Sequence, residues 1–227
     1  NGGAGNNYIY TRDIISMCNI YDTIDGGTFN ISSHGSGTFV NGGISRLEML
    51  HDEWRNVVPG SASRLEIGGP SGNGTLKHNI PDIKARHCLF DHTLAWLTLS
   101  PSPDLGPLLA FVSSDNVYRR AVSFGPVHCS NSGANEAGLN LVAGVGNWEV
   151  KQNVGITGSP SLGSLGNAPH SNTLALATAV FENPTGSHTA ANFAIKAGSI
   201  YKGRSTDGSD PGPNRTLQQT AKQNVQN

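Results

Sequence analysis

The clearest feature of the sequence is an eight-residue pattern of apolar and polar positions that recurs five times. Each window opens on an apolar residue, and the windows begin at Ile14, Leu47, Ile83, Phe111 and Trp148. Their starts are 33, 36, 28 and 37 positions apart, and four of the five windows close on an aromatic residue. The pattern predicts a short strand followed by a tight bend, and not a helix. A period of this length is typical of stacked repeats that bury their faces against their neighbours.

The sixth position of the window predicts a ladder of hydrogen bonds between repeats. It is occupied by Asn19, Asp52, Cys88, Asn116 and Asn153. Asn tolerates the left-handed backbone angles of a bend, and its amide can bond to the equivalent residue of the next repeat. We therefore expect an asparagine ladder, in which Cys88 has a structural role.

A second short alternating segment follows each of the first four windows. These segments are residues 29–31, 65–67, 97–99 and 122–124, and Gly, Pro, Ser and Asn fill the connections. Two or three short strands per repeat, joined by turns, predict a parallel β-solenoid with repeats of 28 to 37 residues.

Three further segments are similar to a known class of protein. They read P-G-S-A-S-R-L-E-I-G-G at 59–69, G-P-V-H-C-S-N at 125–131 and N-F-A-I-K-A-G-S-I-Y-K-G-R-S-T-D-G-S-D-P-G at 192–212. With the repeated window and the Asn column, the chain resembles the right-handed parallel β-helix proteins of the pectate-lyase-like class, in particular the C-terminal portion of long secreted bacterial members. The resemblance implies an all-β, right-handed parallel β-helix, an extracellular or cell-surface location and a polysaccharide partner.

Composition narrows the classes of function. Charged residues make up 14% of the chain and the formal net charge is −1, which gives no electrostatic case for nucleic acid. No run of 18 apolar residues is present, so no membrane span is expected. The three cysteines lack C-x-x-C spacing; they allow one internal disulfide or three free thiols. We expect no metal site and no cofactor, since calcium would need a denser group of carboxylates than this chain offers.

We expect one β-helix domain over residues 1–213 and a polar, Gln-rich tail over 214–227. The sequence leaves open whether this tail is disordered, lies on the surface or forms a helix from 216 to 223, and residues 174–181 are compatible with a late strand or a short helix. Residues 192–213 are expected to cap the end of the stack. Within them, T-D-G-S-D at 206–210 predicts a turn, because it lacks the spacing and closing Glu of a calcium loop.

Outward-facing positions of stacked repeats should gather into one surface patch. We expect the second, fourth and fifth positions of the window to face outward. In the middle repeats these positions hold Glu48, His51, Lys84, Arg86, His87 and Asp115. The candidate catalytic residues are Glu48, Lys84, Arg86, His87 and Asp115, and the candidate ligand-binding residues are His51 and Trp96.

The patch offers only partial chemistry. A lyase needs a Lys or Arg base and charge neutralisation, for which Lys84 and Arg86 are present. A glycosidase needs close carboxylates, but Glu48 and Asp115 stand two repeats, or about 10 Å, apart. The alternative is a solvated surface in which Glu48–Lys84 and His87–Asp115 ion pairs contribute little.

Two functions from different classes follow. The first is a protein that binds or cleaves polysaccharide. The second is a structural or adhesive solenoid, whose open ends associate with other copies without catalysis. The sequence leaves open whether the chain is an enzyme.

Overall fold

The computed structural model describes eleven stretches of the chain. They are residues 11–22, 44–55, 65–68, 82–91, 97–100, 110–119, 127–129, 148–156, 172–175, 177–182 and 194–225. All structural statements below refer to these residues, and Trp96 lies outside them.

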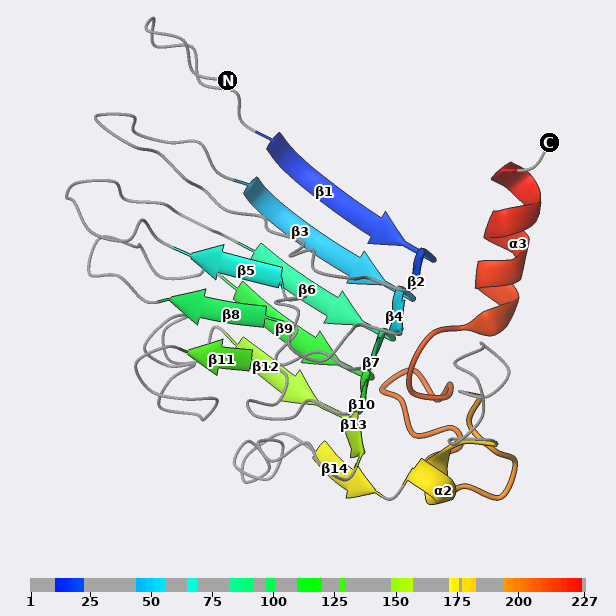
Figure 1. Cartoon of the computed structure of the whole chain (residues 1–227). Helices are drawn as coiled ribbons and strands as arrows, with labels where there is room; N and C mark the ends of the chain where they lie inside the picture. Colours follow the sequence, from blue (N-terminus) through cyan, green and yellow to red (C-terminus); the bar gives the residue numbers. More distant parts are fainter. Residues whose placement is uncertain are drawn as a thin grey trace, which may run out of the picture.

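Three parallel sheets dominate the described structure (Figure 1). The first sheet has the order β1-β3-β6-β9-β12, with β1 Thr11–Met17, β3 Ile44–Leu50, β6 Asp82–Arg86, β9 Ala110–Ser114 and β12 Trp148–Lys151. The second has the order β14-β13-β10-β7-β4-β2, with β2 Ile20–Asp22, β4 Glu53–Arg55, β7 Leu89–Asp91, β10 Val117–Arg119, β13 Asn153–Ile156 and β14 Asn172–Ala175. The third has the order β11-β8-β5, with β5 Leu65–Gly68, β8 Leu97–Ser100 and β11 Val127–Cys129.

The described residues are therefore mostly strand, with little helix. Two helices lie within the described residues, namely α2, Ala177–Val180, and α3, Arg215–Val225. None of the helices in these residues is long and apolar enough to cross a bilayer.

The repeat predicted from the sequence has the observed register. The five window starts pair with one another along the first sheet, from Ile14 through Leu47, Ile83 and Phe111 to Trp148. The seventh and eighth positions pair along the second sheet in the same way, for example Leu89 with Val117. Each window thus contributes one strand to each of two sheets, and the bend lies between the strands.

Alternation along the window separates the core from the surface. In β6 the first, third and fifth residues, Asp82, Lys84 and Arg86, are half-buried. The second and fourth residues, Ile83 and Ala85, are fully buried. The aromatic position also faces inward, since Trp54 and Phe90 are buried. Burial of each such side chain contributes about 2 kcal/mol, which favours this register over a slip by one residue.

The ladder position bonds from one repeat to the next. The backbone N–H of Asn19 donates to Asp52 Oδ1 at 2.8 Å, and that of Cys88 donates to Asn116 Oδ1 at 2.8 Å. The N–H of Asn116 donates to Asn153 Oδ1 at 3.0 Å. Because Cys88 has no side-chain oxygen, it offers no such acceptor to the repeat before it.

The left-handed residue of the bend is not the ladder residue, contrary to our expectation. Positive φ angles of 51° to 60° occur one position earlier, at Cys18, His51, His87, Asp115 and Gln152, which we call the turn column. His and Asp tolerate this region better than most residues. The carboxamide of the ladder residue is then free to point inward and bond to the neighbouring repeat.

Two strands differ from the sequence expectation. In the fourth repeat, the partner of β8 is β11 at Val127–Cys129; the expected strand at 122–124 lies outside the described residues, as does the one at 29–31. Strand β14 adds a sixth rung that the repeated window did not predict, because Asn153 pairs with Asn172 only 19 positions further on. For residues 174–181 the sequence leaves a late strand and a short helix open, and β14 and α2 place one of each there. The connection is much shorter than the 28 to 37 residues that separate the other windows.

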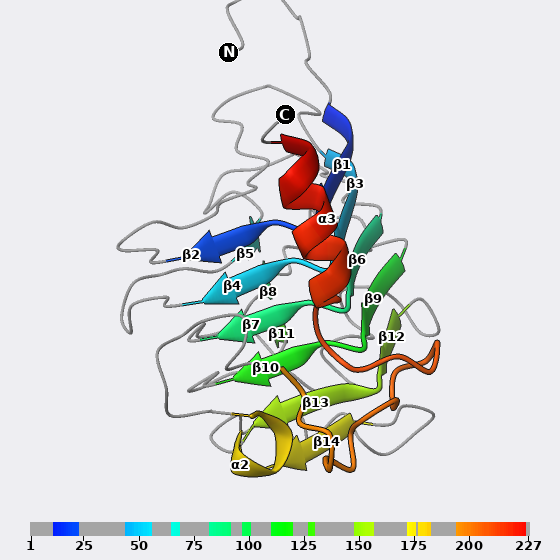
Figure 2. The same ribbon diagram turned by 90° about the vertical axis from the view of Figure 1, so that its right-hand side faces the viewer.

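Residues 194–225, which we call the C-terminal strap, run along the side of the stack instead of capping its end. Near its start, Ile195 packs in one apolar cluster with Val154 and Phe181. Further along, Thr206 bonds to Asp115 in the fourth repeat. Helix α3 then lies beside the bend between the first two sheets at the second repeat (Figure 2).

Candidate functional site

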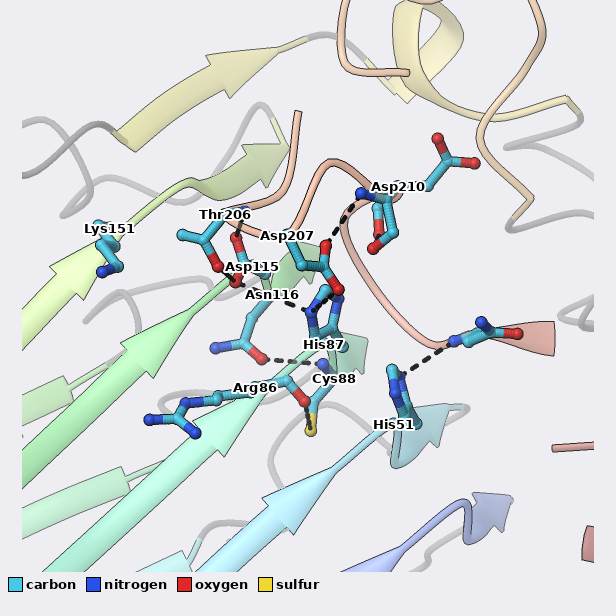
Figure 3. A network of polar contacts seen from close by, with 12 residues as sticks. His51, Arg86, His87, Cys88, Asp115, Asn116, Lys151, Thr206, Asp207 and Asp210 are labelled. Atoms are coloured by element: carbon cyan, nitrogen blue, oxygen red, sulfur yellow. Dashed lines mark hydrogen bonds and ion pairs between the residues drawn. The ribbon is translucent and has the colours of Figure 1, made fainter. Parts of the chain in front are cut away.

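The turn column places His51, His87 and Asp115 in line beneath the C-terminal strap (Figure 3). His87 and Asp115 are buried and His51 is half-buried. The bend aims these side chains away from the core, where the strap covers them. They therefore form a contact surface within the chain.

Asp115 is held by the strap through three hydrogen bonds. The N–H and Oγ1 of Thr206 donate to its two carboxylate oxygens at 2.8 and 2.6 Å. The N–H of Gly212 donates to the backbone oxygen of Asp115 at 2.8 Å. Gly212 has φ of +86°, and an added Cβ would lie 3.2 Å from Val117, so the close approach at this point requires glycine.

His87 faces two carboxylates. Its Nε2 lies 3.4 Å from Asp207 Oδ2 and 3.8 Å from Asp115 Oδ2. The expected His87–Asp115 pair is thus confirmed, and Asp207 joins it. Hydrogen bonds from the side chain and backbone of Ser209 lower the pKa of Asp207, which keeps this exposed carboxylate charged.

His51 fixes the start of helix α3. Its Nδ1 accepts the N–H of Asn214 at 3.3 Å, and its backbone oxygen accepts Gln218 Nε2 at 2.9 Å. Burial and the nearby His87 lower the pKa of His51 from 6.5 to about 4, against a smaller opposing effect of Asp207. His51 is therefore neutral at pH 7.

A buried ion pair completes the attachment of the strap. The guanidinium of Arg215 contacts the carboxylate of Glu53, whose side chain is 0% exposed. The same guanidinium donates to Gln218 Oε1 at 3.0 Å. Sequence reasoning missed Glu53, Thr206, Asp207, Arg215 and Gln218, because their partners are distant in sequence and outside the repeat.

The remaining candidates lie on a different surface, the outer face of the first sheet. Lys84 bonds to Asp82 at 2.8 Å, and Arg86 lies 3.8 Å from Glu48. The expected Glu48–Lys84 pair is replaced by these two. The single patch expected from the sequence is therefore divided between the sheet face, with Glu48, Lys84 and Arg86, and the strap contact, with His51, His87 and Asp115.

A third pair extends the sheet face into the last repeat. Lys151 Nζ lies 2.9 Å from Glu149 Oε1. We call Glu48, Asp82, Lys84, Arg86, Glu149 and Lys151 the charged face. The three acids and three bases of this set balance, and all six side chains remain partly exposed. The exposed Arg46 lies in register with Asp82 on the same side of the sheet.

A cavity of about 470 Å³ lies between the strap and the outer side of the second sheet. Leu89, Val117 and Phe181 form its apolar part. Lys202 and Arg215 also line it, but they already pair with Asp210 and Glu53. The cavity therefore offers no uncompensated positive charge from these two side chains.

The described residues contain no group of three or more His, Cys, Asp or Glu side chains placed to hold a metal ion. Cys18 and Cys88 are both free and buried, and burial raises the pKa of each thiol. Neither is thereby activated as a nucleophile.

Comparison with family models, with curated proteins and with solved structures found no match to this chain. We therefore argue function from the contacts described above.

Proposed function

We propose that the chain is a right-handed parallel β-helix that binds polysaccharide on its charged face, outside the cell or at its surface, without cleaving it. The fold proposal is supported by three parallel sheets that all follow the order of the repeats. It is supported further by the hydrogen-bonded ladder at Cys88, Asn116 and Asn153.

The observation that carries the binding proposal is the layout of the charged face. Glu48 and Lys84 are paired in register on neighbouring strands, and so are Leu50 and Arg86. The rungs follow one another at about 4.8 Å. Charged side chains thus lie on β3 and β6 and again on β12, with Val112 and Ser114 of β9 between them. Such a surface offers donors and acceptors at regular intervals, which suits a repeating ligand whose hydroxyl groups both donate and accept.

Charge balance selects the kind of polysaccharide. Each base on the face has an acidic neighbour within 4 Å, as Arg86 and Glu48 show at 3.8 Å. A polyanion would have to compete with these carboxylates for the basic side chains. A polycation would have to compete with the bases for the carboxylates. We therefore expect a neutral polysaccharide as the ligand.

Binding without cleavage is supported by the position of Asp115. A second carboxylate near Glu48 is needed for glycoside hydrolysis. Asp115, the second carboxylate expected from the sequence, is 1% exposed and accepts two hydrogen bonds from Thr206, so it is not free to act on a bound sugar. Asp82, the carboxylate on the strand next to Glu48, is paired with Lys84. Lys84, the candidate base of a lyase, is engaged by Asp82 at 2.8 Å.

The test is a binding titration of the full chain against neutral, acidic and basic polysaccharides. We expect a neutral member to bind, and Arg86→Gln to weaken its affinity roughly tenfold through loss of a charge-assisted hydrogen bond. Lys222→Gln is the matched control, since it removes the same charge from the exposed side of α3. Equal affinities for the two variants would exclude the charged face as the binding surface.

Cleavage is tested separately by following ultraviolet absorbance for unsaturated products and by measuring reducing ends. We expect neither signal from a polysaccharide that binds. A steady rise in either one would replace the binding proposal with a catalytic one.

A second candidate function, self-association, is favoured by the edge of the first sheet. Among the described residues, β1 pairs only with β3, and its Ile15 and Met17 are 67% and 50% exposed. An open strand edge with apolar side chains invites addition of another strand. Light scattering across a concentration series would detect assembly, and Ile15→Lys should abolish it; a concentration-independent monomer would eliminate this candidate.

A further inference from the structure

Two histidines lie under the C-terminal strap and contact it at different points. His51 Nδ1 accepts the N–H of Asn214 at 3.3 Å. An imidazolium carries a proton on both nitrogens and cannot accept this bond. The start of helix α3 is therefore held by neutral His51.

His87 contacts a different part of the strap. Its Nε2 faces Asp207 at 3.4 Å and Asp115 at 3.8 Å. The turn at residues 205–210 thus rests on contacts that do not involve Nδ1 of His51.

The rings are close enough to influence each other. Their centroids lie 5.0 Å apart, with an interplanar angle of 36°. A charge on one ring opposes a charge on the other. The start of α3 is held most firmly when His51 is neutral.

We propose that this histidine pair makes the docking of helix α3 sensitive to pH, so that acid releases α3 from the second repeat while the turn at residues 205–210 stays attached. The turn stays because Thr206 holds Asp115 by two hydrogen bonds, neither of which involves a histidine. Release of α3 exposes the outer side of the second repeat, where Glu53 lies.

The surrounding charges do not reverse this effect. Asp207 from the strap favours the charged form of His51, but its effect is smaller than those of burial and His87. Arg215 and Glu53 neutralise each other. Asp115, the remaining carboxylate at the corner, is engaged by Thr206.

The direction and size of the pH effect follow from linkage. With α3 docked, the pKa of His51 is lowered to about 4, and it returns toward 6.5 when α3 leaves. Docking is therefore complete above pH 6.5 and weakens as the pH falls from 6.5 to 4. Such a shift corresponds to at most about a hundredfold change in the docking constant. Because His51 is only half-buried, solvent screening reduces the expected change to roughly tenfold.

The test is amide hydrogen exchange of the full chain, measured by NMR between pH 7 and pH 4 and corrected for intrinsic exchange rates. We expect the protection of residues 219–225 in α3 to fall about tenfold, while that of Val117 and Val154 in the second sheet is unchanged. His51→Gln should remove most of this fall, because Gln can accept the same bond without titrating. The chain itself places Gln152 at the equivalent left-handed position, so this backbone geometry accommodates the substitution.

Constant protection of α3 in the wild type, or an equal fall in His51→Gln, would overturn the proposal. If His51→Gln fails to fold at pH 7, the ¹⁵N shift of His51 Nδ1 in the wild type decides the question. A midpoint that coincides with the loss of α3 protection supports the proposal, and separate midpoints refute it.

Discussion

Replacement of Asn116 by Ala tests whether the ladder holds the repeats together. Asn116 is fully buried, and its side chain forms hydrogen bonds with the preceding repeat and with its own strand. Its Oδ1 accepts the N–H of Cys88 at 2.8 Å, and its Nδ2 donates to Ala85 O at 3.0 Å and to Ser113 Oγ at 3.2 Å. The substitution removes the ladder bond to the preceding repeat. The ladder bond to the following repeat remains, because the backbone N–H of Asn116 still donates to Asn153.

The expected loss of stability follows from these contacts. A buried N–H of Cys88 without an acceptor costs about 1–3 kcal/mol, and the two lost donations cost about 1 kcal/mol each. We therefore expect Asn116→Ala to lower the free energy of unfolding by about 3–5 kcal/mol. In a chain of this size, the corresponding fall in Tm is roughly 10 °C.

Urea unfolding followed by circular dichroism measures the change, and Asn19→Ala is the matched control. Asn19 occupies the same window position in the first repeat, but it is exposed, and its side chain donates to Ser16 Oγ at 3.0 Å. Its replacement should cost less than about 1 kcal/mol. If the two variants lose equal stability, the ladder does not hold the repeats together in the way described.

Three further changes address the contacts around the second repeat. Cys88→Asn should stabilise the chain by about 1 kcal/mol, because the new Oδ1 can accept the N–H of Asp52 and complete the ladder. Asp52→Asn should stabilise the chain at pH 7 but not at pH 3. Burial raises the pKa of Asp52, so the native state disfavours the charged carboxylate. The unfolded state acquires this charge as the pH rises through 3.8, and the wild type therefore loses stability that the variant keeps. The substitution keeps the acceptor for Asn19. Arg215→Ala should destabilise by about 3 kcal/mol, because it leaves the charge of Glu53 buried without a partner.

Thermal and urea unfolding at the stated pH values measure all three, and each has an outcome that contradicts it. A clear fall in the free energy of unfolding of Cys88→Asn, beyond a small packing cost, would contradict the proposed ladder. A change in the stability of Asp52→Asn that is the same at pH 3 and pH 7 would contradict the raised pKa of Asp52. Arg215→Ala should be partly rescued by Glu53→Gln, and absence of rescue would show that the loss has another cause.

The sequence predicted the repeat well because its period and its chemistry agree. An apolar start and an aromatic end position each window, and the register from Ile14 to Trp148 follows directly. A helix over 216–223 is one of the alternatives that the sequence leaves open for the tail, and α3 covers Arg215–Val225. These features depend on local pattern and neighbouring repeats only.

The candidate site was harder to predict because it depends on contacts across the whole chain. Side-chain position within the window gave the outward direction of His87 and Asp115, but not the strap that covers them. Arg215 and Glu53 are 162 positions apart, and no periodic signal connects them. The sequence pattern predicted the left-handed residue of the bend at the ladder position, because Asn tolerates this conformation well. In the structure it is the residue one position earlier, for example His87 or Asp115.

The most direct test of the proposed function is to map the binding surface on the full chain by NMR. A neutral polysaccharide that binds is added, and the shifts of backbone amides are followed. We predict that the perturbed amides belong to β3, β6, β9 and β12, around the charged face. Perturbations confined to the C-terminal strap or to the second sheet, with the charged face unchanged, would contradict the central claim.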